Sequence, residues 1–220
     1  MLVAIRRLIP VVVGAFAVVG GLVVTRPLPP PPKPAPGVQA SAKPAPARTI
    51  LVYNRPARFI VVHHQGAAEF RNLAAAEAWF RSIGHDKDMP SAYSAYVTSR
   101  GELWQGRGEA YVSAASRGIN SVSVAICLLG NLNERPPTDA QLATGGRWLA
   151  GALERHPGAV VIEHGDVARI TGKPVGTSCP GAFAQRLDTA RTLVHIARGM
   201  SVAAAKARTA AELKAKAARK

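Results

Sequence analysis

Three residues with metal-binding side chains lie at the ends of predicted strands: His63, His164 and Cys179. The ends of strands are places where a rigid sheet presents side chains to a cleft. Two neutral imidazoles and one thiolate form a known catalytic zinc set, which leaves the fourth tetrahedral position for water. The same residues also allow a plainer interpretation, in which the histidines are hydrogen-bonded core groups and the cysteine is a small buried hydrophobe.

Their neighbours refine this hypothesis. His64 could supply a fourth ligand, but adjacent strand residues point to opposite faces, so we do not expect His63 and His64 to share one metal ion. Cys179 precedes Pro180, which can begin a helix, and a helix N-terminus there would favour the ionised thiolate. Cys127 lies in a predicted central strand, so we expect a core residue that forms no disulfide with Cys179.

Apolar strands that alternate with helices must position these residues. We predict strands at 59–63, 93–98, 102–105, 122–129 and 159–163, and helices at 67–83, 138–156 and 183–197. Thr138 and Gln141 stand in capping-box positions at the start of the second helix, and Pro157 and Gly158 end it. Strands interleaved with helices predict an α/β fold with a mixed central β-sheet flanked by helices.

Composition and charge exclude several classes of protein. Two cysteines are too few for a disulfide-stapled mini-protein, and 220 residues allow one domain of ordinary size plus extensions. The net charge is +15, of which residues 1–49 carry +6 and residues 199–220 carry +5. Only +4 remains for residues 50–198. Because most of the positive charge lies at the two ends, the compact part is only mildly basic. This weakens the alternative that the chain is a nucleic-acid-binding protein whose His and Cys residues are structural.

Residues 1–26 predict export. Arg6 and Arg7 precede residues 8–24, a run of 17 residues without a charge. This length is the lower limit for a membrane-spanning helix, and the two arginines favour an inside N-terminus. We expect an uncleaved membrane anchor with an extracytoplasmic domain after it. A cleaved signal segment, which would leave a secreted protein, and a buried core helix are the alternatives.

Two low-complexity segments flank the compact domain, which we expect at residues 50–198. Residues 27–49 are rich in Pro and Ala and predict an extended spacer. Residues 199–220 contain Ala, Lys and Arg with almost no large apolar side chain. We expect a solvated basic tail there, because a helix of this composition has no face to bury. The alternative is electrostatic attachment to an anionic polymer or lipid surface.

Seven motifs occur in a fixed order along the chain. They are FIVVHH (59–64), AY (92–93), GELWQGR (101–107), NSVSVAICLLGN (120–131), TDAQL (138–142), HGDV (164–167) and TSCPG (177–181). Together they resemble the type 2 N-acetylmuramoyl-L-alanine amidase family, which includes peptidoglycan recognition proteins and phage lysozymes of the amidase kind. The resemblance covers about residues 57–190.

The resemblance implies a zinc hydrolase that cleaves the amide between the lactyl group of N-acetylmuramic acid and L-alanine of the stem peptide. It implies that His63, His164 and Cys179 are the zinc ligands. Tyr93 matches the catalytic tyrosine of the family, and Thr177 matches a position held by lysine or threonine in catalytic members. Members that bind peptidoglycan without cutting it typically lack the cysteine. We therefore expect a monomeric amidase that binds peptidoglycan and no nucleic acid. A non-catalytic, membrane-tethered peptidoglycan-binding module is the alternative.

The chemistry of amide hydrolysis assigns further roles. Zinc lowers the pKa of water and polarises the carbonyl, and the developing oxyanion needs prearranged donors. The Tyr93 hydroxyl is the first candidate for this donor and Thr177 a weaker second. Two carboxylates are candidates for the group that transfers the proton during hydrolysis. Glu163 is next to a ligand but alternates away from it along the strand, and Asp166 can instead hydrogen-bond a ligand histidine.

The chain also departs from the family pattern. Ser94 and Ala115 stand where many members have histidine, and residues 163–166 read EHGD in place of the usual GHRD. The stretch between His164 and Cys179 is longer than in compact members, with residues 170–176 inserted. These departures concern substrate recognition and the shape of the cleft, and they leave the three metal ligands in place.

Overall fold

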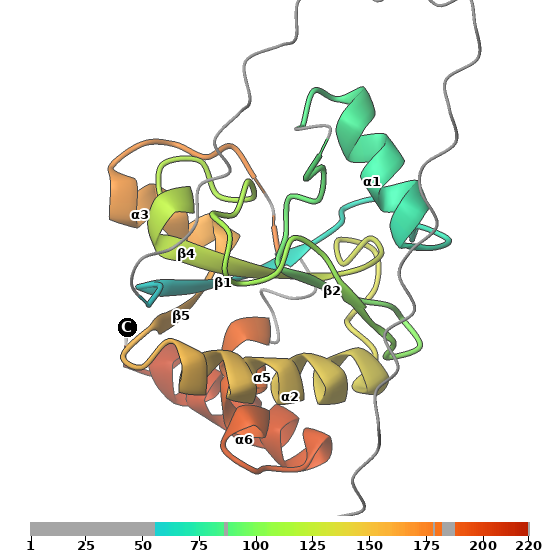
Figure 1. Ribbon diagram of the computed structural model, residues 1–220. Coiled ribbons are helices and arrows are strands. Elements are labelled where there is room, and N and C mark those ends of the chain that lie inside the picture. Colours follow the sequence, from blue (N-terminus) through green and yellow to red (C-terminus); the bar gives the residue numbers. More distant parts are fainter. Residues whose placement is uncertain (1–55, 86–87, 178, 182–187, 220) are drawn as a thin grey trace, which may run out of the picture. The chain divides into compact units, whose positions relative to one another are not determined.

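A computed structural model describes residues 56–85, 88–177, 179–181 and 188–219 (Figure 1). The strands and α-helices in these ranges are β1 (Phe59–His64), α1 (Leu73–Ser82), β2 (Ala95–Val97), β3 (Leu103–Gln105), β4 (Ser123–Leu128), α2 (Asp139–Arg155), β5 (Val160–Glu163), α3 (Val167–Thr171), α5 (Thr189–Ala197) and α6 (Val202–Ala217). Two short 3-10 helices, Asn120–Val122 and His164–Asp166, precede β4 and follow β5. The expected anchor at 1–26 and spacer at 27–49 lie outside the described residues. No helix in the described ranges has the length and apolar character needed to cross a membrane.

The five strands form one mixed sheet in the order β3-β2-β4-β1-β5. β1 pairs in parallel with β4 and β5, β2 pairs in parallel with β4, and β3 runs antiparallel to β2. The carboxyl ends of parallel strands meet at one edge of a sheet, which is where open α/β folds place their sites. The end of β1 carries His63, and His164 follows β5 directly. The predicted α/β fold with a mixed central sheet flanked by helices is confirmed.

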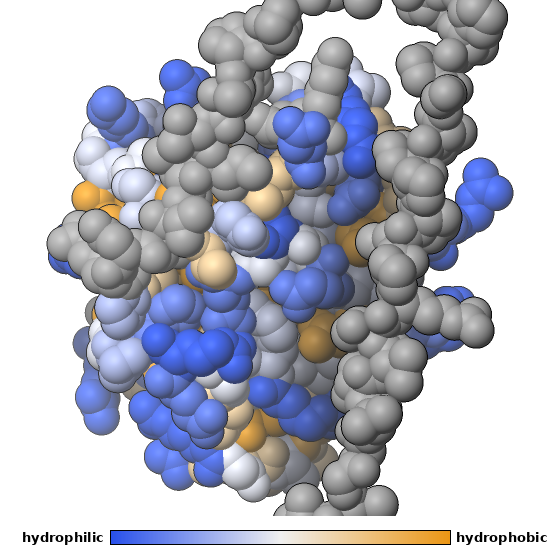
Figure 2. Space-filling view, viewed as in Figure 1, coloured by the Kyte–Doolittle hydropathy of each residue, from blue (hydrophilic) through white to orange (hydrophobic). Residues whose placement is uncertain are grey.

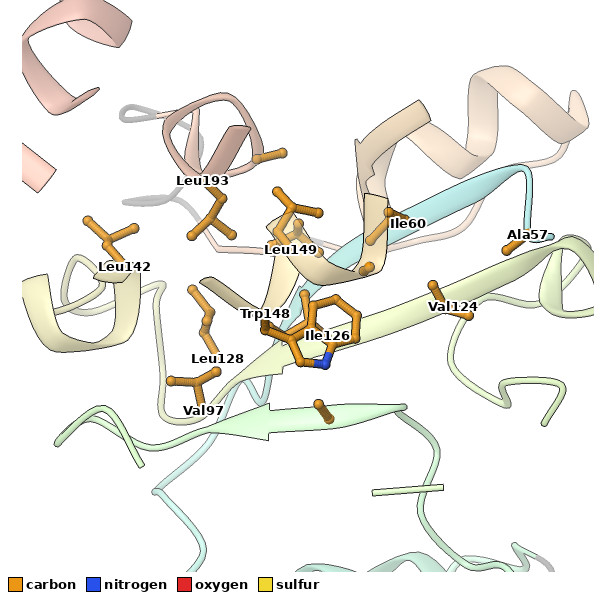
Figure 3. Close-up of a cluster of buried hydrophobic side chains, with 14 of the residues drawn as sticks. Ala57, Ile60, Val97, Val124, Ile126, Leu128, Leu142, Trp148, Leu149 and Leu193 are labelled. Atoms are coloured by element: carbon orange, nitrogen blue, oxygen red, sulfur yellow. The ribbon is translucent and has the colours of Figure 1, made fainter. Parts of the chain in front are cut away.

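One face of the sheet packs against α2 and α5 (Figure 1). Alternation along β1 directs Ile60 and Val62 to this face, where Leu149 of α2 and Leu193 of α5 complete a buried apolar cluster (Figure 3). Full burial of one such side chain contributes about 1.5–3 kcal/mol. Gly146 of α2 lets α5 approach closely, because a Cβ there would overlap the side chain of Ile196. The helices α2 and α5 therefore support β1 from the face of the sheet opposite the candidate site.

The start of α2 matches its prediction. The Thr138 hydroxyl oxygen accepts from the Gln141 backbone N–H at 3.1 Å, and the Gln141 side-chain oxygen accepts from the Thr138 backbone N–H at 3.1 Å. This reciprocal pair satisfies donors that the first turn of a helix leaves unpaired. The helix ends at Arg155, just before Pro157 and Gly158. The capping box predicted from the sequence is confirmed.

The other face of the sheet carries loops, α1 and the candidate site. Val61 and Ala125 point to this face and form a second buried cluster with Ile162. Cys127 is fully buried in a third cluster with Phe80 and Tyr96. Both cysteines are free thiols. The expectations that Cys127 is a core residue and that it forms no disulfide with Cys179 are therefore confirmed.

Two helices differ from their predicted extents. α1 begins at Leu73, later than expected, because Asn72 caps it by accepting from the Ala75 backbone N–H at 2.9 Å. The helix predicted at 183–197 is observed as α5, Thr189–Ala197, and residues 182–187 lie outside the described residues.

The expectation that residues 199–220 have no face to bury was wrong. Residues 202–217 form α6, which packs on α5 and fully buries Ala205 and Thr209. The hydroxyl of Thr192 in α5 donates to the hydroxyl oxygen of Thr209 at 3.0 Å. Small side chains let the two helices approach without a large apolar stripe, while most Lys and Arg side chains of α6 stay exposed. Figure 2 has the same view as Figure 1, and it shows mostly hydrophilic side chains on the part of the surface where α2 and α6 lie.

Candidate metal centre

The structure brings His63, His164 and Cys179 together. One ligand atom from each lies within 4.8 Å of the others. The Cys179 Sγ atom is 3.6 Å from Nδ1 of His63, and the two imidazole centroids are 4.5 Å apart. His63 and Cys179 are buried, whereas His164 is partly exposed. The cluster therefore has a buried side on the sheet and an open side at His164.

The donor set and its spacing fit a zinc ion. In a tetrahedral site with Zn–S of about 2.3 Å and Zn–N of about 2.0 Å, the sulfur and nitrogen lie about 3.5 Å apart. The observed Sγ–Nδ1 distance of 3.6 Å matches one edge of such a tetrahedron. Three protein ligands leave one position for solvent or substrate, as in catalytic zinc sites.

His64 lies next to this cluster without joining it. Its Nδ1 accepts from the Leu132 backbone N–H at 3.0 Å, and its own backbone N–H donates to the Cys179 sulfur at 3.2 Å. The alternation of side chains along β1 thus separates the two histidines, as the sequence predicts. His64 instead orients the sulfur through its backbone.

Electrostatics at the cluster favour neutral imidazoles. Burial lowers the pKa of His63 well below its ordinary value, and the neighbouring His164 lowers it further. Burial also lowers the pKa of His164. Neutral imidazole is the form that binds a metal ion. Both histidines are therefore held in the ligand state at neutral pH.

The expected helix N-terminus effect on Cys179 stays a prediction, because residues 182–187, which would form that helix, lie outside the described residues. Cys179 and Pro180 lie in a turn, and burial raises the pKa of the Cys179 thiol to about 12 despite the hydrogen bond from the His64 backbone N–H. The desolvation of the charged form outweighs that one hydrogen bond. A divalent cation at the cluster would supply the positive charge that a buried thiolate needs.

Tyr93 stands beside the cluster. Its ring centroid is 5.0 Å from that of His63, and the ring also contacts Phe80 and Tyr96 at 5.9 and 5.4 Å. Burial, followed by the nearby Cys127 and Cys179, raises the pKa of the Tyr93 hydroxyl well above its ordinary value. The hydroxyl therefore stays protonated and can donate a hydrogen bond.

Thr177 contacts the backbone of the ligand candidate Cys179. Its hydroxyl oxygen accepts from the Cys179 backbone N–H at 3.0 Å. This contact orders the turn that carries the sulfur, in the manner of Ser and Thr residues that bond the backbone two residues on. This contact uses the hydroxyl oxygen of Thr177 as an acceptor and leaves its hydrogen for the donor role expected from the sequence.

The two candidate carboxylates point to other partners. Glu163 accepts from the Ala190 backbone N–H at 3.4 Å near the start of α5, and burial raises its pKa to about 7. Asp166 accepts from the Glu163 backbone N–H at 3.1 Å and pairs with Arg169. Among its described contacts, the alternative of a hydrogen bond to a ligand histidine is not observed. Asp166 thereby closes the turn after β5 and fixes where His164 emerges.

Ser116 is a contact of the cluster that sequence reasoning missed. Its hydroxyl oxygen lies 3.1 Å from Nε2 of His63, the ring nitrogen other than the one nearest Cys179. Ser116 is fully buried in the loop before β4. A single serine in a loop carries no pattern that could have identified it. The adjacent Ala115, at a position where the family often has histidine, was the available signal for this loop.

A groove opens beside His164. It has a volume of about 700 Å³ and is lined by the 114–120 loop, His164 and the 171–175 segment. Arg117 and Lys173 contribute exposed positive charges to it, and no Asp or Glu is among its described lining residues. The lengthened 170–176 stretch thus forms one wall of the groove at the candidate metal centre.

Comparison with known proteins places this site in a family. Residues 53–182 match the family of N-acetylmuramoyl-L-alanine amidases, Amidase_2. Peptidoglycan-recognition protein SA of Drosophila melanogaster is 26% identical over 133 residues, which are 58% of this chain and 63% of that protein. A peptidoglycan recognition protein of Bombyx mori is 28% identical over 106 residues, 46% of this chain and 54% of that protein. The chain thus spans less than two thirds of the length of these curated relatives.

Solved structures share the fold. The N-acetylmuramoyl-L-alanine amidase LysC of Clostridium intestinale aligns with a TM-score of 0.52 and 22% identity over 64% of this chain and 91% of that one. The Ph2119 endolysin of a Thermus scotoductus bacteriophage aligns with a TM-score of 0.51 and 19% identity over 62% and 88%. The family match covers more than half of the chain. This protein belongs to the N-acetylmuramoyl-L-alanine amidase family.

Proposed function

We propose that this protein is a zinc-dependent N-acetylmuramoyl-L-alanine amidase. Its reaction is hydrolysis of the amide between the lactyl group of N-acetylmuramic acid and L-alanine in peptidoglycan. The observation that carries the proposal is the meeting of His63, His164 and Cys179 within 4.8 Å, beside an open groove, in a domain of an amidase family. These are the donors and the open geometry of a catalytic zinc site.

The residues divide the work of the reaction. His63, His164 and Cys179 would hold the ion, which when bound supplies Lewis acidity toward the amide carbonyl and toward water. The Tyr93 hydroxyl, kept protonated by burial, donates a hydrogen bond to the oxygen on which negative charge develops. The groove beside His164 orients the stem peptide so that its amide lies at the cluster.

A non-catalytic peptidoglycan-binding module is the second candidate. The names of the curated relatives, which are peptidoglycan recognition proteins, favour it. Cys179 favours hydrolysis, because members of the family that bind without cutting typically lack this cysteine. Removal of metal separates the two functions, since it stops hydrolysis under the first and leaves peptidoglycan binding largely intact under the second.

The test uses the full chain and purified peptidoglycan. We expect a stoichiometric amount of zinc in the purified protein and release of peptides with a new N-terminal alanine, detected by end-group labelling. Treatment with a chelator should stop the release, and added zinc should restore it. Binding of peptidoglycan with no new N-terminal alanine, in protein shown to contain zinc, would establish the binding module instead.

We propose that the amidase domain acts outside the cytoplasmic membrane. Arg6 and Arg7 before the uncharged residues 8–24 support a membrane anchor, and the Pro-rich residues 27–49 support a spacer. N-terminal sequencing of the membrane and soluble fractions tests this placement. An intact N-terminus in the membrane fraction supports the anchor, whereas a soluble protein beginning after residue 26 supports a cleaved signal.

A further inference from the structure

Ser116 contacts the side of His63 that faces away from the sulfur. Its hydroxyl oxygen is 3.1 Å from Nε2, while Nδ1 of the same ring is 3.6 Å from the Cys179 sulfur. His63 is 1% exposed and Ser116 is fully buried, so water does not compete for this nitrogen. The two ring nitrogens therefore have different surroundings.

This difference decides which nitrogen carries the proton. A neutral imidazole has one N–H donor and one lone-pair acceptor, and the partner of one nitrogen determines the role of the other. A metal ligand must present its lone pair to the ion, so its second nitrogen carries the hydrogen and needs an acceptor. The Ser116 hydroxyl oxygen, 3.1 Å from Nε2, is placed to be this acceptor.

We propose that Ser116 is a positioning residue that holds His63 in the Nε2–H tautomer, with the Nδ1 lone pair directed at the metal position. The proposal deepens the proposed function and rests on it where zinc is concerned. Ser116 acts through His63 and touches neither substrate nor ion.

The loop holds Ser116 rigidly enough for this role. The Ser116 backbone N–H donates to the side-chain oxygen of Asn120 at 2.7 Å, and its carbonyl accepts from the Ile119 backbone N–H at 3.0 Å. The Ser113 hydroxyl donates to the same Asn120 oxygen at 3.4 Å and lies 3.5 Å from the Ser123 hydroxyl at the start of β4. A partly buried polar network thus connects the Ser116 loop to the sheet that carries His63.

The first experiment measures zinc affinity of the full chain by competition with a chelator. We expect Ser116→Ala to weaken zinc binding about 10- to 100-fold, the usual effect of removing a hydrogen-bond partner of a ligand histidine. Ser113→Ala is the matched control. It removes a buried hydroxyl from the same network without touching His63, so its zinc affinity should equal that of the wild type. Equal affinity of Ser116→Ala and wild type, with both proteins folded, would overturn the proposal.

The second experiment reads the tautomer directly and needs no metal. Nitrogen-15 NMR of His63 in the zinc-free wild type should show hydrogen on Nε2. A folded Ser116→Ala protein should show a mixture of tautomers, whereas Ser113→Ala should match the wild type. Hydrogen on Nδ1 in the wild type would overturn the proposal even if Ser116→Ala fails to fold. If the wild type binds no zinc, the proposed function fails, and the tautomer still decides the role of Ser116.

Discussion

The sulfur of Cys179 lies 3.6 Å from Nδ1 of His63, although 116 residues separate the two in the chain. His63 is the penultimate residue of β1, and Cys179 follows the long segment after β5. Both are buried, and the spacing fits two ligands of one divalent cation. The proposed function requires such a cation, and the predictions below test this proposal.

Cys179→Ser is expected to lose zinc and hydrolysis together. The hydroxyl oxygen of serine is a much weaker zinc ligand than a thiolate. Metal analysis and peptide release from peptidoglycan measure the two effects. Cys127→Ala is the matched control, because Cys127 is buried outside the cluster. It should retain a stoichiometric amount of zinc, and unchanged turnover in Cys179→Ser would disprove the ligand assignment.

Tyr93→Phe is expected to retain zinc and to lose about 10²–10³-fold in kcat, the usual effect of removing one oxyanion donor. The phenyl ring preserves the packing against His63 at 5.0 Å while the hydroxyl is removed. Tyr96→Phe serves as control, because Tyr96 packs against Tyr93 but has no assigned role in the reaction. Comparable rates for the wild type and Tyr93→Phe would reduce Tyr93 to a packing residue.

Arg117 and Lys173 are expected to act on substrate binding. They face a groove without described acidic lining residues, and the stem peptide of peptidoglycan carries carboxylates. Substitution of either by Gln should raise KM about two- to fivefold and leave kcat unchanged, since exposed charge pairs contribute about 0.2–1 kcal/mol. Added salt should reduce the difference. Lys214→Gln, on the distant helix α6, should leave KM at the wild-type value; an equal rise in that variant would point to a general charge effect.

Glu212 is expected to make the docking of α6 dependent on pH. Hydrogen bonds from Arg208 and Arg191 lower the pKa of Glu212 to about 2, from an ordinary value of about 4.3. A carboxylate with a depressed pKa stabilises the fold above its unfolded pKa and loses this contribution as the pH falls toward its folded value. The difference in Tm between the wild type and Glu212→Gln should therefore be largest near pH 6 and should shrink toward pH 2.

A control separates this effect from general acid denaturation. Glu154 is an exposed acid of α2 that forms no ion pair with a described residue. Glu154→Gln should have a Tm close to that of the wild type at every pH. If the gap between wild type and Glu212→Gln is the same at pH 6 and pH 2, the ion pairs of Glu212 with Arg208 and Arg191 do not stabilise the helix pair.

Much of the fold followed from local patterns in the sequence. Apolar runs identified β1 and β4, and Thr138 with Gln141 marked the start of α2, because strand alternation and helix capping involve residues close in the chain. Local patterns gave the wrong interpretation of α6, because its packing depends on residues far away in the chain. Its sequence has no apolar stripe, and the fit of Ala205 and Thr209 against α5 depends on a surface that only the folded chain provides.

The sequence by itself determined the chemistry of the candidate site: two histidines, one cysteine and a tyrosine in the order typical of an amidase family. Only the tertiary structure decided their surroundings. The folded chain places Ser116 beside His63, directs Glu163 toward α5, and buries Cys179 enough to raise the pKa of its thiol. These features arise between residues far apart in the chain, where distance and desolvation act and no sequence pattern records them.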